Sequence, residues 1–150
     1  MKVGKVVLYG ILFLFLFSLF YCDSDDDEEI ITKEVIGSRL PDLPFCTVVR
    51  AGNTYYFSGK IPIEEARGDI TNETKNIMEA FRKDLESVNL TFKDVVKGTV
   101  FITDMDYYKP MNDVYKTYFT SDPPARECVA VKEISGNSLV EISFIAVKTD

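Results

Sequence analysis

Five stretches of the chain are rich in β-branched and aromatic residues, mostly with alternating apolar and polar positions, and this pattern predicts β-strands. Turn residues separate them. Arg50-Ala51-Gly52-Asn53 is the predicted turn of a β-hairpin, and Gly136-Asn137-Ser138 turns the chain before the last strand. The predicted strands cover residues 45–49, 54–58, 95–102, 125–131 and 139–148.

Between the second and third predicted strands, apolar residues recur every three to four positions, as they do on one face of a helix. Thr71 or Asn72 is a plausible N-cap for this helix, and Asn89 is suited to end it. The apolar face consists of Ile70, Thr74, Ile77, Phe81, Leu85 and Val88. A helix with one apolar face is expected to pack against a sheet.

A second helix is predicted from Tyr107 to Phe119, with Pro110 near its first turn and Pro123-Pro124 after its end. Its apolar positions are Met111, Val114, Tyr115, Tyr118 and Phe119. Residues 31–40 are only weakly patterned. The resulting order is ββαβαββ, which predicts an α+β fold with a mixed sheet and two helices packed on one of its faces.

The first 22 residues differ from the rest of the chain. Lys2 and Lys5 precede an uncharged run from Val6 to Cys22, whose length fits a signal-peptide core or a short membrane anchor. Cys22 directly follows the apolar core, as at a bacterial lipoprotein lipid-attachment site. A lipid anchor, an uncleaved helix and a cleaved secretory signal all remain open. We therefore predict that residues 1–22 anchor the chain to a membrane or export it.

Residues 23–35 are a predicted acidic spacer, and residues 36–150 are the predicted globular domain. The net charge of −7 is concentrated in the spacer, because residues 23–29 contribute −6. Two lysines near the start contribute +2, so residues 30–150 carry −3. A mildly acidic domain disfavours a broad nucleic-acid-binding surface.

The chain contains no histidine. This excludes the usual histidine general base, a Ser-His catalytic triad and a histidine-ligated zinc ion. Cys22, Cys46 and Cys128 are too few and too scattered for a disulfide framework or a zinc knuckle. The chemistry of any active site must therefore rest on other side chains.

Arg126 is the main candidate for ligand binding on the residues alone. It stands where Pro123-Pro124 give way to a predicted strand, and its guanidinium is a permanent cation with a rigid fork of donors. Such a group is suited to a carboxylate or phosphate. A surface arginine at a strand end is the alternative interpretation. Cys128 lies two residues further along, so the two side chains share one face of the strand.

Six groups of short motifs lie within residues 36–148. They are Pro44-Phe45; Ser58-Gly59-Lys60; Val95-Val96-Lys97 with Phe101-Ile102-Thr103-Asp104-Met105; Met111-Asn112-Asp113-Val114-Tyr115; Pro124-Ala125-Arg126-Glu127-Cys128; and Val140-Glu141-Ile142. In order and spacing they resemble the reactive intermediate deaminase family, RidA or YjgF. The resemblance implies a chorismate-mutase-like fold and a homotrimer with clefts between subunits. It also implies hydrolysis of enamines and imines, such as 2-aminoacrylate, to 2-oxo acids and ammonia, without a cofactor or metal.

The same resemblance implies roles for individual residues. Arg126 matches the arginine that grips the substrate carboxylate, and Glu141, on the next strand along the chain, matches the acidic residue that positions the attacking water. Cys128 matches a wall of the site, Asn112 matches a recurrent asparagine, and Gly59 is expected to admit substrate or a neighbouring backbone closely. Without the resemblance, Glu141 would be interpreted as a solvent-side residue, Cys128 as a small buried residue and Asn112 as a structural amide.

Several positions depart from the family pattern, among them Cys46-Thr47 where Ser-Gln is usual. Phe45 stands where a tyrosine is usual and so keeps the ring near the substrate without its hydroxyl, while Lys60 and Glu73 each replace a glutamine and Ala80 an asparagine. An alternative function is therefore a non-catalytic trimeric module that binds a small carboxylate or a partner protein at a membrane surface. The apparent export favours this alternative, since enamines form mainly in the cytosol. A cytoplasmic location, as for most of the family, is the alternative to export.

Overall fold

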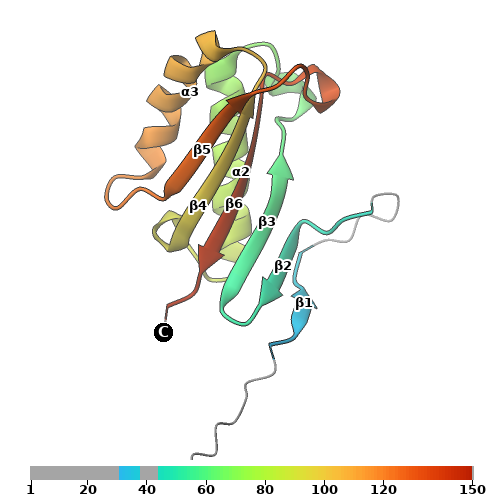
Figure 1. Ribbon diagram of the computed structural model, residues 1–150, viewed down its shortest axis with the longest axis vertical. Helices are drawn as coiled ribbons and strands as arrows, with labels where there is room; N and C mark the ends of the chain where they lie inside the picture. Colours follow the sequence, from blue (N-terminus) through green and yellow to red (C-terminus); the bar gives the residue numbers. More distant parts are fainter. Residues whose placement is uncertain (1–30, 38–43, 150) are drawn as a thin grey trace, which may run out of the picture. The chain divides into compact units, whose positions relative to one another are not determined.

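The computed structural model describes residues 31–37 and 44–149, which form a six-stranded sheet with two α-helices on one face (Figure 1). The strand order is β1-β2-β3-β6-β4-β5. The strands are β1 (Lys33–Val35), β2 (Val48–Ala51), β3 (Thr54–Lys60), β4 (Val95–Ile102), β5 (Ala125–Ala130) and β6 (Val140–Val147). The helices are α2 (Ile70–Ser87) and α3 (Tyr108–Tyr115). The predicted α+β fold and the order ββαβαββ are confirmed, with β1 as an additional strand at the start.

The sheet is mixed because one neighbouring pair, β4 and β5, runs parallel, whereas the other pairs are antiparallel. Helix α3 lies in the connection between β4 and β5. Strand β6 returns to the middle of the sheet, between β3 and β4, and leaves β5 at an edge. Consequently β5 and β6 follow each other in the chain but are not neighbours in the sheet.

The alternation of residues along β6 defines the two faces of the sheet. Val140, Ile142, Phe144 and Ala146 are at most 1% exposed and face the helices. The ring of Phe144 lies 4.6 Å, between centroids, from the ring of Phe81 on α2. The residues between them on β6 point to the opposite face, which neither α2 nor α3 covers (Figure 1). We refer to the two sides as the helix-covered face and the open face.

Helix α2 confirms the predicted apolar face, since all six predicted positions are buried. The predicted N-cap was wrong by two or three residues. Asp69 is the cap, and its carboxylate accepts a hydrogen bond of 2.8 Å from the backbone N–H of Asn72. Asn89 ends the helix with a positive φ of 58°, as expected for an asparagine after a helix C-terminus.

The second predicted helix is divided into two parts. Helix α3 ends at Tyr115, and a 3₁₀ turn, η4 (Lys116–Tyr118), continues the chain. The tighter turn places the Tyr118 hydroxyl where it donates a 2.8 Å hydrogen bond to Glu79 on α2. The single helix predicted over 107–119 was therefore too long.

Strand β1 was not predicted, and it falls inside the predicted spacer 23–35. Its three residues are exposed, so no alternation of apolar and polar positions could reveal it. It is held instead by pairing with β2 and by an ion pair of 2.8 Å between Glu34 and Arg50. The sheet thus begins at Lys33, slightly before the predicted domain boundary.

The predicted export or anchor segment, 1–22, and Cys22 lie outside the described residues and stay predictions. Within the described ranges, no helix is long and apolar enough to cross a membrane.

Candidate active site

The register of the sheet places Arg126 on the helix-covered face. Arg126 on β5 pairs with Gly98 on β4, and Cys128 pairs with Val100. Gly98 and Val100 are buried beneath the helices, and paired residues point to the same side of a sheet. Arg126 and Cys128 therefore share one face, as predicted.

The guanidinium of Arg126 rests on aromatic rings of α3. Its central carbon lies 4.8 Å from the ring centroid of Tyr115 and 5.8 Å from that of Tyr108. One terminal nitrogen lies 3.9 Å from the sulfur of Met111. Cation–π contacts of this kind orient the planar group without neutralising it. No carboxylate among the described residues forms an ion pair with Arg126, so its charge is available to a ligand.

A pocket of about 350 Å³ opens beside Arg126. It is lined by Asn112, Tyr115, Lys116, Phe119, Pro123, Pro124 and Arg126. The structure thus brings together two of the predicted site residues, Arg126 and Asn112. The two prolines that precede β5 form the apolar part of the wall together with the rings of Tyr115 and Phe119.

Gly98 leaves space for Tyr115, whose ring and that of Tyr108 form an aromatic platform under Arg126. A Cβ atom at this position would lie 2.7 Å from the Tyr115 hydroxyl and 3.1 Å from the ring of Phe144. Tyr115 is 6% exposed, and its hydroxyl has no hydrogen-bond partner among the described residues. Burial raises the pKa of Tyr115. Tyr115 is therefore neutral and presents its ring face to the Arg126 cation.

Tyr108 was not predicted as a site residue, and Tyr115 was predicted only as an apolar position of its helix. Tyr108, Met111 and Tyr115 are spaced i, i+3 and i+7, which places them on one side of α3. This spacing, in a helix that precedes the candidate Arg126 in the sequence, was the one indication of an aromatic contact with the arginine. It is equally typical of a core-facing helix, so the spacing alone could not decide.

Burial raises the pKa of the Cys128 thiol, and the nearby Arg126 charge opposes this effect only in part. A thiol with a raised pKa is mostly protonated near neutral pH and is a poor nucleophile. Cys128 packs against the edge of the hydrophobic core. Cys128 does not line the pocket beside Arg126, and its wall-forming or backbone-contact role stays a prediction.

Glu141 lies on the open face. It pairs with Phe101 on β4, between the buried residues Val140 and Ile142 of β6. Its carboxylate rests against Gly59, where any Cβ atom would collide with it. The space at Gly59, predicted to admit substrate or a neighbouring backbone, is occupied instead by the Glu141 side chain. Glu141 forms no hydrogen bond or ion pair with any other residue in the described part of the chain, and its acceptor oxygens are available.

Phe45 belongs to the same side of the molecule as Glu141. It lines a pocket of about 480 Å³ together with Ser58, the residue before Gly59, and its side chain is 48% exposed. The Ser58 hydroxyl donates a 2.7 Å hydrogen bond to the carbonyl of Cys46. That bond ties the segment carrying Phe45 to β3.

The predicted site residues therefore form two groups. Arg126, Cys128 and Asn112 make a half-site on the helix-covered face, whereas Phe45, Gly59 and Glu141 make a half-site on the open face. The sequence predicted that Glu141, on the next strand along the chain, acts on the same substrate as Arg126. Within one chain this is wrong, because β4 separates β5 from β6 and the two side chains point to opposite faces.

Comparison with known proteins places this arrangement in one class of α+β proteins. The family model described as "Endoribonuclease L-PSP" matches residues 37–148. A RutC family protein from Pyrococcus horikoshii is 36% identical over 124 residues, which cover 77% of this chain and 98% of that protein. The 3-aminoacrylate deaminase RutC of Acinetobacter baylyi is 32% identical over 124 residues, covering 79% of this chain and 97% of the relative.

Solved structures agree with the sequence relatives. A protein of the conserved Rid family, YyfA from Yersinia pestis, superimposes with a TM-score of 0.73 at 29% identity, covering 78% of this chain and 100% of that one. E. coli TdcF with bound serine gives a TM-score of 0.68 at 28% identity, covering 81% and 99%. The chain belongs to the RidA/YjgF family. This family includes a 3-aminoacrylate deaminase, and its matching model carries the description of an endoribonuclease.

Proposed function

We propose that the protein hydrolyses reactive enamine or imine intermediates of the 2-aminoacrylate type to 2-oxo acids and ammonia. The observation that carries the proposal is Arg126, a cation without an ionic partner among the described residues, oriented by two tyrosine rings beside a pocket. A bidentate arginine–carboxylate contact matches one end of such a substrate. The similarity to the 3-aminoacrylate deaminase of Acinetobacter baylyi supports the same reaction class.

The reaction requires two groups, the Arg126 guanidinium and the Glu141 carboxylate. Once the enamine has tautomerised to the imine, Arg126 holds the carboxylate. Glu141 takes a proton from water while the water oxygen bonds to the imine carbon, and passes that proton to nitrogen. Glu141 then moves the hydroxyl proton to nitrogen, the carbon–nitrogen bond breaks, and ammonia leaves. The 2-oxo acid remains, and atoms and charges balance without a redox step.

We propose further that the active unit is a homotrimer with its sites between subunits. The two half-sites lie on opposite faces of one sheet, so a second copy is needed to bring a Glu141 to an Arg126. The open face supports contact with another copy because it carries apolar side chains. Tyr56 and Val129 are each 47% exposed there, and both pair with further apolar residues, Ile145 and Phe101.

The deaminase assay tests the proposal directly. Full-length protein is coupled to an enzyme that generates 2-aminoacrylate, and release of ammonia or 2-oxo acid is compared with the buffer rate. Arg126→Ala is expected to lower the rate by about 10²-fold or more, because a charge-assisted bidentate contact is lost. Arg50→Ala is the matched control, since Arg50 is a partly exposed arginine at the far end of the sheet. No acceleration by the wild-type protein, or full activity of Arg126→Ala, would refute the proposal.

Phe45 favours a second candidate function. It carries no hydroxyl, and it lines the open-face pocket where polar contact with substrate or water is expected. A trimer that binds a small carboxylate or a partner protein without turning it over would tolerate this residue. Calorimetric binding of a 2-oxo acid without any turnover of 2-aminoacrylate would support this candidate.

We also propose that residues 1–22 attach the chain to a membrane or direct its export, through Cys22 lipidation, an uncleaved helix or a cleaved signal. Pelleting of the full-length protein with membranes, and its release when the chain starts at Ile30, are expected for an anchor. A full-length protein that stays in the supernatant would count against an anchor and would leave a cleaved secretory signal or a cytoplasmic location.

A further inference from the structure

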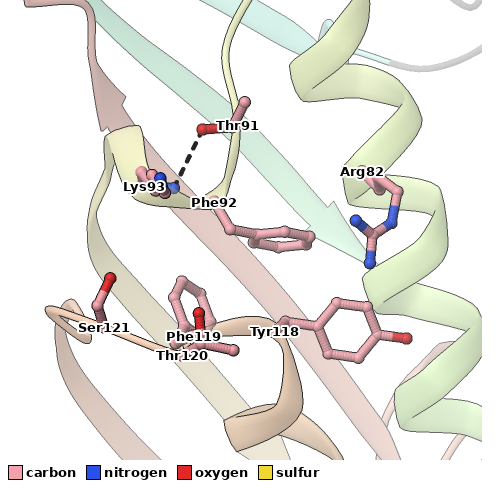
Figure 2. A pocket seen from close by; sticks show the side chains of 8 residues that line it. All are labelled: Arg82, Thr91, Phe92, Lys93, Tyr118, Phe119, Thr120 and Ser121. Carbon is pink, nitrogen blue, oxygen red and sulfur yellow. Dashed lines mark hydrogen bonds between the residues drawn. The ribbon is translucent and has the colours of Figure 1, made fainter.

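A third pocket, of about 260 Å³, lies on the side of the helices and shares only Phe119 with the pocket beside Arg126. Three segments form it: α2, the short turn η2 (Phe92–Asp94), and the end of η4 with the loop that follows. Its lining residues, drawn in Figure 2, are Arg82, Thr91, Phe92, Lys93, Tyr118, Phe119, Thr120 and Ser121. Apart from Phe119, none of them belongs to the two half-sites.

The Arg82 side chain is 46% exposed and lies at one wall of this pocket, where it is paired with Glu79. Its Nε donates a 3.1 Å hydrogen bond to Glu79, and the other oxygen of Glu79 accepts the Tyr118 hydroxyl at 2.8 Å. The guanidinium carbon lies 5.3 Å from the Tyr118 ring centroid and 5.7 Å from that of Phe92 (Figure 2). The bonds from Tyr118 and Arg82 lower the pKa of Glu79 and keep it charged. Glu79 thus fixes Arg82 through Nε alone.

The remaining donors at this pocket are unused. The terminal nitrogens of Arg82 form no hydrogen bond within the described ranges, and the same holds for the Lys93 ammonium and the hydroxyls of Thr120 and Ser121. The Thr91 hydroxyl, by contrast, is engaged with Asp94 at 3.0 Å. No carboxylate lines the pocket. The Lys93 ammonium, two hydroxyls and the terminal nitrogens of Arg82, whose charge is paired with Glu79, therefore border one hollow without an acceptor among the described residues.

We propose that this pocket binds the phosphate group of a small phosphate ester. A tetrahedral phosphate offers acceptor oxygens in several directions and can use donors from all three segments, whereas a planar carboxylate would use little beyond the arginine fork. The rings of Tyr118 and Phe119 give the organic part of the ester an apolar surface. The site is separate from the proposed deaminase site, so either proposal can fail without the other.

The test uses inorganic phosphate as the probe and the isotope-labelled full-length protein in detergent. Amide NMR signals of Thr91, Lys93, Thr120 and Ser121 are expected to shift saturably with phosphate and not with chloride at equal ionic strength. Arg82→Gln is expected to weaken binding about tenfold or more, because charge-assisted hydrogen bonds are lost. Arg50→Gln is the matched control. Arg50 is also paired with a glutamate, but on the sheet, so this variant should bind as the wild type does.

A second variant covers the possibility that Arg82→Gln disturbs the Glu79 network. Lys93→Gln changes an exposed residue outside that network and is expected to weaken binding about threefold or more. Absence of saturable shifts in the wild-type protein would overturn the proposal, as would unchanged binding in both variants. It would also be overturned by shifts confined to Asn112 and Lys116, which would place the phosphate at Arg126.

Discussion

The contact between Gly98 and Tyr115 predicts a non-additive effect on stability. In Gly98→Ala the new methyl group meets the Tyr115 hydroxyl at 2.7 Å and the Phe144 ring at 3.1 Å, in a fully packed core. Overpacking of this size costs about 1–3 kcal/mol in the free energy of unfolding. Tyr115→Phe removes the hydroxyl, which is buried without a partner among the described residues, and is expected to be neutral or stabilising by up to about 1 kcal/mol.

In the double variant the nearest colliding atom is gone and only the contact with Phe144 remains. The cost of Gly98→Ala should therefore fall by about 1 kcal/mol when Tyr115 is already phenylalanine. Urea unfolding of the four proteins, with the free energy extrapolated to water, measures this coupling. Equal costs of Gly98→Ala in both backgrounds, within about 0.5 kcal/mol, would refute the reasoning. The hydroxyl would then not be what limits the space at Gly98.

Three further predictions concern single residues. Asp69→Ala should lower the stability by about 1 kcal/mol, seen as a lower urea midpoint, because the N-cap of α2 is lost, and an unchanged midpoint would contradict the capping role. Hydrogen bonds from two flanking lysines hold the pKa of Asp113 at about 2, so its carboxyl NMR signal should titrate near pH 2. The small contribution of this group to stability is present above its unfolded-state pKa near 3.8 and is lost as the pH falls towards 2. A titration midpoint near 3.8 would contradict the ion pairs. Gly59→Ala should displace the Glu141 carboxylate and lower deaminase turnover about tenfold or more with little change in KM, and an unchanged turnover would contradict a role for Glu141 in the chemical step.

Much of the fold could be predicted because its core elements are strongly periodic. Strand β6 alternates strictly between buried and half-buried residues, and the six predicted apolar positions of α2 are all buried. Strand β1 could not be predicted, because its residues are exposed and backbone pairing with β2 positions them. The break between α3 and η4 likewise depends on a tertiary contact, the bond from Tyr118 to Glu79.

The site was only partly predictable, for a topological reason. The chemistry of Arg126 and its shared face with Cys128 follow from residue type and from the two-residue period of a strand. The relation between Arg126 and Glu141 does not, because it depends on β4 lying between two strands that are consecutive in sequence. The role of Tyr108 and Tyr115 was hidden, since the same helical spacing describes a core-facing surface.

The stacked position of Arg126 has a consequence for how binding energy is used. An arginine in solution samples many rotamers, and fixing them costs up to about 2 kcal/mol. Here the tyrosine platform has already restricted those rotamers during folding, before any ligand arrives. An incoming carboxylate therefore meets donors that are already ordered, and it loses less affinity to the ordering of the protein. The cost appears in the stability of the folded state, because Arg126 is a cation at the edge of the core without an ionic partner among the described residues. Fold stability and ligand binding therefore favour different residues at this position.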